Sequence, residues 1–323
     1  MPTYPISFSM PPEKIVEKIP EKTRVVAHII PGNSSTYIYD SEESYYQGYK
    51  ESFFGITMKK AGWDCMRHYE ILANGCIPYF VDLENIPENT MTHFPKDIIA
   101  ETNKIFLDII EKKTMDEADI QKCNYYIEKL LNYTRTHLTT TAMVKYILAK
   151  VGLTPLRIKD TQYATPSPLI TAPKVGKKKI LFLSGDIQPD YLRCLTLSGF
   201  KNIYGSECHD YPKVPHIYTD YPDSCNNFWG KGITYTKIVD PEKRNNSYDE
   251  TIVEDILSHA YDIVIYGSYH RGLPFFDTVS AIYDSKDIVF LCGEDCDLAN
   301  NFVNHECKLN EKNAEYNLFI REL

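Results

Sequence analysis

The stretch of residues 52–87 constrains the fold more than any other part of the chain, because two strand patterns flank a helix pattern within it. Residues 52–58 form a short apolar run rich in aromatic side chains, and residues 76–81 form a second apolar run; both predict strands. Between them lie a loop with two lysines, residues 59–63, and a segment with helical periodicity. The chain therefore predicts a strand–loop–helix–strand unit, which is typical of α/β proteins.

The helix of this unit has defined ends and two distinct faces. Asp64 is the predicted N-cap, and Gly75 stands where a glycine in the left-handed conformation often ends a helix. Arg67, Glu70 and Asn74 are spaced i, i+3 and i+7, so we expect them to share one face. The opposite, apolar face is made by Met66, Tyr69, Leu72 and Ala73.

The polar face has the chemistry to hold a nucleoside diphosphate. Arg67 lies in the first turn, where backbone N–H groups and the helix dipole favour an anion. Lys59 and Lys60 can add positive charge, and Glu70 can accept hydrogen bonds from both hydroxyls of a ribose. The alternative is that Arg67 and Glu70 form an ordinary exposed pair, which is common on helices and contributes little to stability.

The sequence SFFGITMKKAGWDCMRHYEILANGCIPYF, which begins at Ser52, resembles the donor-site motif of exostosin-type glycosyltransferases and, more loosely, of other transferases with the GT-B fold. The matching positions are Arg67, Glu70 and the Gly-Cys-Ile-Pro run at residues 75–78. The resemblance implies that Arg67 contacts the diphosphate and Glu70 the ribose of a nucleotide sugar, and that the segment after this run lines the donor cleft. The candidate donor-site residues are therefore Lys59, Lys60, Arg67, Glu70, Asn74 and Asp82.

Composition and charge argue against several classes of protein. The chain has a net charge of −9, and its densest basic run is the lysines at residues 177–179, so we expect no nucleic-acid partner. No stretch is long and apolar enough to predict a membrane span, and the first residues lack the layout of a signal peptide. The nine cysteines are scattered, which favours reduced thiols in a soluble, cytoplasmic protein. Most exostosin relatives are membrane-anchored Golgi proteins, and this expectation departs from them.

The pattern along the chain predicts two halves. Residues 1–150, which begin with a Pro-rich arm and a first strand at residues 24–30, are the expected nucleotide-sugar (donor) half. Residues 151–178 are rich in Pro, Thr and Ser and are the expected linker. Residues 179–323 are the expected acceptor half.

The second half contains three apolar runs that predict buried strands, at residues 179–183, 262–266 and 287–291, with a further strand at residues 202–204. Each of the three runs ends in glycine and polar residues, helical stretches separate them, and no later strand is expected. This order predicts a parallel, Rossmann-like sheet. We therefore expect an α/β fold with two Rossmann-like halves facing a cleft, as in GT-B enzymes. The donor motif comes first, so the order of the halves is unusual or the chain is circularly permuted.

Polar residues follow these strands, and the carboxyl ends of parallel strands lie at one edge of a sheet. Asp186 follows the first strand, and His270 follows the second. We expect one of these two side chains to act as the general base that takes the proton of the acceptor hydroxyl. Asp186 is favoured over His270, because Ser184-Gly185-Asp186 turns directly into a predicted helix. The alternative is that such residues cap helices and fill loops. The candidate residues of the acceptor cleft are Arg271, Glu294 and Asp295.

These observations favour a glycosyltransferase that moves a sugar from a UDP- or GDP-sugar to a glycan or other hydroxyl acceptor, without a metal or other cofactor. Arg67 and nearby cations would stabilise the leaving diphosphate. Two alternatives stay open. Asp295-Cys296-Asp297 follows a strand and could hold Mn²⁺ or Mg²⁺, as in metal-dependent GT-A transferases. The chain could also be a nucleotide- or glycan-binding module without catalysis.

Overall fold

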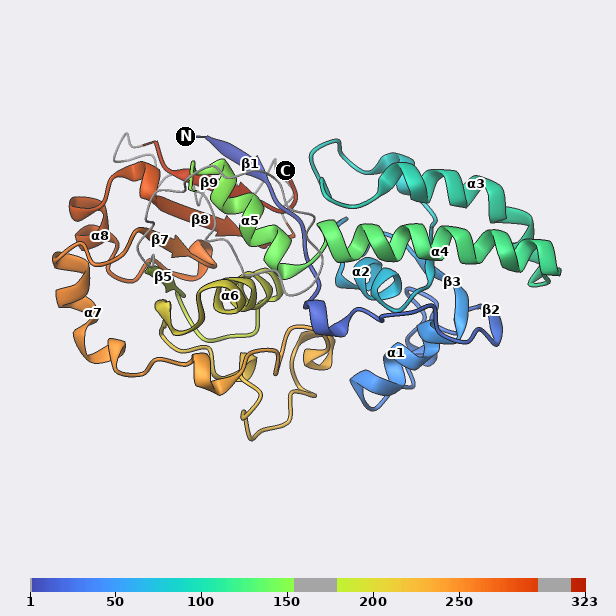
Figure 1. Cartoon of the computed structure of the whole chain (residues 1–323), viewed down its shortest axis with the longest axis horizontal. Coiled ribbons are helices and arrows are strands. Elements are labelled where there is room, and N and C mark those ends of the chain that lie inside the picture. The colour runs from blue at the N-terminus through green and yellow to red at the C-terminus, as the bar shows by residue number, and fades with distance from the viewer. Residues whose placement is uncertain (1, 154–178, 296–314) are drawn as a thin grey trace, which may run out of the picture.

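The computed structural model describes residues 2–153, 179–295 and 315–323, and within them the chain forms two parallel sheets with flanking helices (Figure 1). The larger sheet has six strands in the order β1-β9-β8-β7-β5-β6, and the smaller has three in the order β2-β3-β4. The two sheets lie side by side along the long axis of the molecule (Figure 1). The expected α/β class with parallel strands is therefore confirmed.

The smaller unit contains the strand–loop–helix–strand unit at the predicted place. Its elements are β2 (Arg24–Val26), α1 (Glu42–Lys50), β3 (Ser52–Thr57), α2 (Met66–Ala73), β4 (Ile77–Phe80), α3 (Lys96–Lys112) and α4 (Glu117–His137). Helix α1 packs on β3, α3 packs on β4, and α4 packs on α2. The first strand is shorter than the expected residues 24–30, and β4 pairs in register with β3, Ile77 beside Phe54.

The C-terminal end of α2 agrees with the prediction, whereas its N-terminal end does not. Gly75 has a φ of 64° and ends the helix as expected. At the other end the N-cap is Cys65, which makes no side-chain capping bond. Asp64 is buried instead, and its carboxylate accepts hydrogen bonds from the Tyr69 hydroxyl at 2.6 Å and the Phe8 N–H at 2.8 Å. Asp64 therefore joins α2 to the N-terminal segment, and its predicted role as N-cap was wrong.

The larger unit has helices on both faces of its sheet. Its elements are β1 (Thr3–Pro5), α5 (Thr140–Lys150), β5 (Ile180–Leu183), α6 (Tyr191–Tyr204), β6 (Cys208–Tyr211), α7 (Tyr248–Leu257), β7 (Ile263–Tyr266), α8 (Phe276–Ile282), β8 (Ile288–Cys292) and β9 (Asn317–Ile320). Ile180 and Phe182 of β5 belong to the core that includes α5 and α6, whereas Leu181 and Leu183 belong to the core that includes α7 and α8. Burial on both faces explains why these strands are apolar at every position.

Three expectations about strands were wrong. Residues 202–204 lie in the last turn of α6, and the strand that pairs with β5 on that side is β6. Strand β8 is followed by β9, so it is not the last strand. Residues 3–5 form β1, which pairs with β9, although the sequence predicted an extended arm there. Such short strands carry no periodicity of their own, and their pairing partners are distant in sequence.

The boundary expected at residue 150 does not coincide with the division between the two sheets. Strand β1 belongs to the larger sheet, and α5 packs mainly on α6. The chain therefore starts in the larger unit, builds the smaller one, and returns through α5 (Figure 1). Most of the expected linker, residues 154–178, lies outside the described residues. In the described ranges, no helix has the length and hydrophobicity that crossing a membrane would require.

Candidate functional site

Glu70 of α2 lies at the contact between the two units. Its side chain is buried, and each carboxylate oxygen accepts one hydroxyl. Oε2 accepts from Tyr45 of α1 at 2.8 Å, and Oε1 accepts from Thr234 at 2.5 Å. Thr234 comes from the segment between β6 and α7 of the larger unit. Burial raises the pKa of Glu70, while the hydrogen bonds from Thr234 and Tyr45 and the charge of Arg67 act in the opposite direction.

Arg67, one turn before Glu70, has a buried guanidinium nitrogen that no described residue satisfies. Its Nη1 is buried without a hydrogen-bond partner, and the side chain makes no salt bridge within the described ranges. Tyr37, Tyr45 and Tyr49 lie within electrostatic range of the guanidinium, and so does Tyr191, the first residue of α6. A buried charged donor without an acceptor costs free energy. An anion bound between the two units would remove this cost.

The other candidates for the donor site differ in their surroundings. Lys59 and Lys60 are exposed, and the Lys59 ammonium lies 4.8 Å from the centre of the Trp63 ring. Asn74 is buried and donates to the backbone carbonyl of Glu70 at 2.8 Å. Asp82 follows β4, and its buried Oδ1 has no hydrogen-bond partner among the described residues. The contacts thus connect Asn74, but not Asp82 or the two lysines, with Glu70.

The loops after β5 and β7 bring the second group of candidates together. A Cβ at Gly185 would lie 2.3 Å from the backbone nitrogen of Gly272, so a glycine is required where these loops touch. Arg271 reaches two carboxylates from this contact: Nη1 lies 3.7 Å from Asp186 Oδ2, and Nη2 lies 3.9 Å from Glu294 Oε1. The strand-end residues expected at one edge of the sheet are therefore neighbours.

His270 and Asp186 have different ionic partners within this group. His270 Nε2 lies 2.7 Å from Glu294 Oε1, and this contact lowers the pKa of Glu294. Asp186 Oδ1 lies 3.2 Å from Nη1 of Arg193, whose side chain is fully buried. A histidine oriented by a carboxylate is a common arrangement for proton transfer. Asp186, in contrast, is already engaged by the guanidinium of Arg193.

Two of these residues, His270 and Glu294, form with Asp190 a cluster that has the residue types of a metal site. Asp190, His270 and Glu294 place one potential ligand atom each within 4.8 Å of the others. Arg271 reaches into the same group, with Nε 3.3 Å from Asp190 Oδ2. Because a guanidinium already neutralises these carboxylates, the cluster suits a divalent cation less well than its residue types suggest.

Of the alternative metal motif, Asp295-Cys296-Asp297, only Asp295 is among the residues that the structure describes. Asp295 pairs with Arg321, and a Cβ at Gly62 would lie 2.6 Å from its Oδ1. Cys296 and Asp297 lie outside the described residues. The contacts of Asp295 therefore connect the end of β8 with the loop that precedes α2.

The last residues of the chain connect the two groups of candidates. Arg321 is buried and contacts both the Asp295 carboxylate and the backbone carbonyl of Asp64. Glu322 accepts hydrogen bonds from the backbone N–H groups of Trp63 at 3.1 Å and Asp64 at 2.9 Å. A carboxylate of the chain itself thus binds the N–H groups just before the helix N-terminus at which we expected a phosphate.

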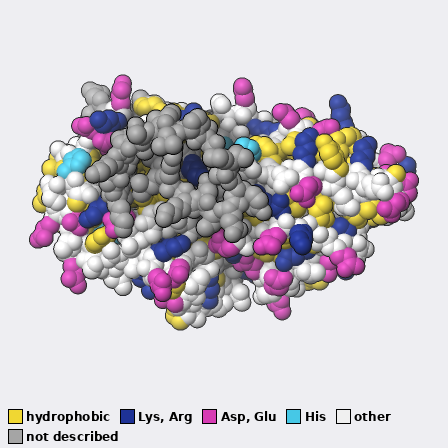
Figure 2. Space-filling model, in the orientation of Figure 1, with side chains coloured by type: hydrophobic (Ala, Val, Ile, Leu, Met, Phe, Trp, Pro, Cys, Tyr) yellow, Lys and Arg dark blue, Asp and Glu magenta, His cyan; other side chains and the backbone are white. Residues whose placement is uncertain are grey.

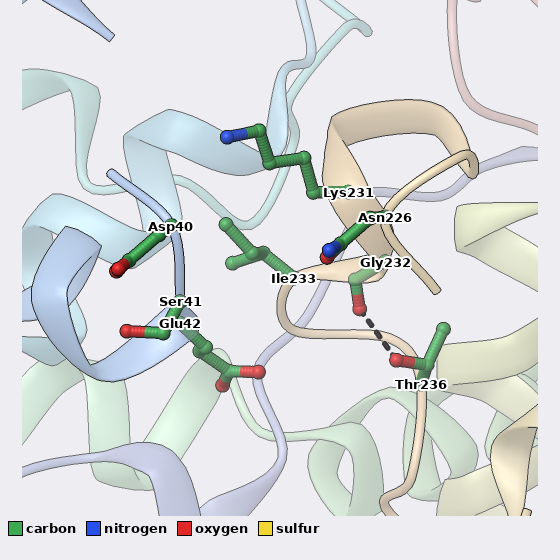
Figure 3. Close-up of a pocket in the computed structure, with 8 residues that line it drawn as sticks. All are labelled: Asp40, Ser41, Glu42, Asn226, Lys231, Gly232, Ile233 and Thr236. Carbon is green, nitrogen blue, oxygen red and sulfur yellow. Dashed lines mark hydrogen bonds between the residues drawn. The ribbon is translucent and has the colours of Figure 1, made fainter. Parts of the chain in front are cut away.

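A small hollow lies along the contact between α1 and the segment that contains Thr234 (Figure 3). Figure 3 shows the start of α1 on one side and the 226–236 segment on the other. The lining residues are Asp40, Ser41, Glu42, Asn226, Lys231, Gly232, Ile233 and Thr236. Arg67 is not among these lining residues, so the hollow is not the candidate anion site.

Several residues of this site were not predicted. Tyr45 lies in a Tyr-rich segment, a pattern that could have indicated it. Thr234 and Glu322 lie in segments without periodicity or a motif, and their contacts with α2 and the loop before it span 164 and 258 positions in sequence. Only the folded chain brings them to the site.

The surface charge is mixed. Over the described part of the face in Figure 2, acidic and basic side chains are interspersed, and no continuous basic surface is present there. This pattern agrees with the negative net charge of the whole chain and gives no electrostatic reason for nucleic-acid binding.

Comparisons of the chain with protein-family models, with curated protein sequences and with solved structures found no match. The functional argument therefore depends on the residues of the site and their geometry.

Proposed function

We propose that the protein is a glycosyltransferase that binds a nucleotide sugar between its two units, which act as GT-B-like, Rossmann-like halves. One observation carries the proposal: the buried Nη1 of Arg67 has no partner among the described residues, and Glu70, one turn away, has both oxygens bound by hydroxyls. The diphosphate would supply the anion that Arg67 lacks. The ribose would supply two hydroxyls to Glu70, and the acceptor would be a glycan or another hydroxyl compound.

In this proposal the second group of residues performs the proton transfer. The acceptor hydroxyl loses its proton to His270 as its oxygen bonds to the anomeric carbon, and the bond from that carbon to the diphosphate breaks. Glu294, whose Oε1 lies 2.7 Å from Nε2, orients the imidazole. Arg67 stabilises the charge that develops on the leaving diphosphate. No step of this scheme requires a metal.

The change Arg67→Ala tests the donor site. We expect it to weaken binding of UDP or GDP by about 1.5–3 kcal/mol, because a charge-assisted hydrogen bond in a partly buried site is lost. Arg67→Lys should restore only part of the affinity, since an ammonium lacks the planar fork of a guanidinium. Thermal shift with UDP, GDP and CMP identifies the nucleotide, because a ligand that binds only the folded state raises Tm. Calorimetry then gives the affinity.

Arg24→Ala is the matched control. Arg24 belongs to the same unit, its side chain is exposed, and its Nη2 lies 3.9 Å from Glu51, so its loss should leave nucleotide affinity unchanged. If Arg67→Ala binds the nucleotide as tightly as the Arg24→Ala control does, Arg67 does not hold the diphosphate and the proposed donor site is wrong.

A further inference from the structure

We propose that Thr234 closes the nucleotide site by taking the place of a substrate hydroxyl on Glu70. The segment of residues 229–237, called the 229–237 loop, must then withdraw before a ribonucleotide binds. The inference rests on the proposed function, because it concerns the same carboxylate. It adds a conformational step and a residue that determines how strongly the protein prefers ribose.

The hydrogen bonds around Glu70 match those that a vicinal diol would make. The Tyr46 hydroxyl lies 2.6 Å from Thr234 Oγ1, and Thr234 in turn donates to Glu70 Oε1 at 2.5 Å. Tyr45 donates to the other oxygen, Oε2, at 2.8 Å. Each carboxylate oxygen therefore has one hydroxyl donor, as it would with the two hydroxyls of a ribose.

Burial prevents a ligand from joining this arrangement without displacing part of it. Thr234 has no exposed surface, and Glu70 is 5% exposed. Tyr45 belongs to the regular helix α1 of the same unit as Glu70, whereas Thr234 arrives from an irregular segment of the other unit. Thr234 is therefore the hydroxyl that can leave.

The backbone of the 229–237 loop is strained where it holds Thr234. Thr234 has a φ of 76°, which is unfavourable for a β-branched residue, and Lys231 and Lys237 have φ values of 57° and 52°. Such strain persists only where surrounding contacts hold it in place, and it is often found at sites that move or bind ligands. Withdrawal of the loop would release this strain.

Polar contacts hold the side of the loop that faces α1, whereas Tyr235, the residue after Thr234, is fully buried in the core against Tyr191. The Lys231 ammonium donates to the backbone carbonyl of Tyr39, and the Thr234 N–H lies 3.4 Å from Glu42 Oε2. The residues that line the hollow between the loop and α1 are polar or glycine apart from Ile233 (Figure 3). We therefore place the movement at the α1 side of the loop, where it exposes little apolar surface, while Tyr235 stays in the core.

Thr234→Val tests the inference, because valine keeps the shape of threonine and removes the donor. We expect calorimetry to show about tenfold tighter binding of the ribonucleotide identified by thermal shift, UDP or GDP, which corresponds to about 1.4 kcal/mol. The ligand then no longer competes with the Thr234 hydroxyl. The gain should be smaller for the 2′-deoxy form, which brings one hydroxyl fewer. Hydrogen exchange without ligand should become faster in the 229–237 loop and at the start of α1.

Thr236→Val is the matched control. Thr236 lies in the same loop, but its hydroxyl donates to the backbone carbonyl of Gly232 at 2.7 Å and does not bind Glu70. Its loss should leave ribonucleotide affinity and the exchange of α1 unchanged. Equal affinities of wild type and Thr234→Val for the ribonucleotide would overturn the inference alone. Failure of both proteins to bind any nucleotide would overturn the proposed function, and this inference with it.

Discussion

The contacts of the two candidate bases, His270 and Asp186, lead us to reverse the order in which the sequence ranked them. His270 and Asp186 both follow buried strands, but the folded chain gives them opposite partners. Glu294 lies 2.7 Å from the imidazole, whereas the guanidinium of buried Arg193 lies 3.2 Å from the Asp186 carboxylate. A carboxylate beside an imidazole can orient it for proton transfer, whereas the Asp186 carboxylate is already engaged by a guanidinium. We therefore favour His270 over Asp186 as the base.

His270→Ala should reduce the rate of sugar transfer by about 10²–10⁴-fold, the usual contribution of a general base. Asp186→Asn should reduce it less, because the carboxylate is engaged by arginine. Initial rates with the sugar form of the nucleotide that raises Tm would measure both effects. Nucleotide affinity is the control and should stay unchanged in both variants, because neither residue contacts Arg67 or Glu70 in the described structure. Turnover near that of wild type in His270→Ala would place the base elsewhere.

At the scale of elements, the packing of α5 on α6 attaches the end of the first half of the chain to the larger unit. Thr139 caps α5 by accepting a hydrogen bond from the N–H of Ala142 at 3.1 Å. Gly199 of α6 lies against the first turn of α5: a Cβ there would lie 2.4 Å from the backbone carbonyl oxygen of Thr140. Backbone atoms cannot move as freely as the end of a side chain, so the two helices approach this closely only because residue 199 is glycine.

Gly199→Ala should therefore lower the free energy of unfolding by about 1–3 kcal/mol, the usual cost of overpacking. Urea denaturation would measure it. Gly48→Ala in α1 is the matched control, because its new Cβ would approach only the hydroxyl end of Tyr39, at 2.9 Å. Alanine favours helices over glycine, so we expect the control to be neutral or slightly stabilising. Similar destabilisation by both changes would contradict the close packing of α5 on α6.

Across the whole molecule, buried titratable groups tie stability to pH. Burial lowers the pKa of three histidines, to about 3 for His68 and to about 4 for His93 and His216. Burial also raises the pKa of Asp64 to about 7. Below pH 6.5 the unfolded chain binds protons at the three histidines that the folded chain does not bind, so stability falls as the pH falls. Asp64 has the opposite effect between about pH 4 and pH 7, because the folded chain keeps its proton.

Among the groups with the largest pKa shifts, three histidines act against Asp64, so we expect a net loss of stability on acidification. We expect the free energy of unfolding to decrease from pH 6.5 to pH 4.5, with each histidine contributing a slope of up to about 1.4 kcal/mol per pH unit. Denaturation by urea across this range would measure the slope. His68→Gln should make the slope shallower by one such contribution, whatever it does to stability at a single pH. An unchanged slope in this variant would show that His68 is not kept neutral by the fold.

Local chemistry in the sequence determined much of the fold. The strand–loop–helix–strand unit, the helix end at Gly75 and the caps at Asp116 and Thr139 were all predictable, because each depends on neighbours within a few residues. The buried strands β5, β7 and β8 were predictable because an apolar run bounded by polar residues fits a covered parallel strand. The spacing that places Arg67, Glu70 and Asn74 on one side of a helix was equally local.

Only the tertiary structure decided which of these residues meet. The pairing of β1 with β9, the contact of Thr234 with Glu70 and the docking of Glu322 on the loop before α2 each join segments distant in sequence. No periodicity encodes such contacts, because their partners are chosen by the packing of whole elements. The sequence therefore determined the side chains that we propose bind a nucleotide sugar. The fold decided that Nη1 of Arg67 has no hydrogen-bond partner among the described residues and that Glu70 is already bound.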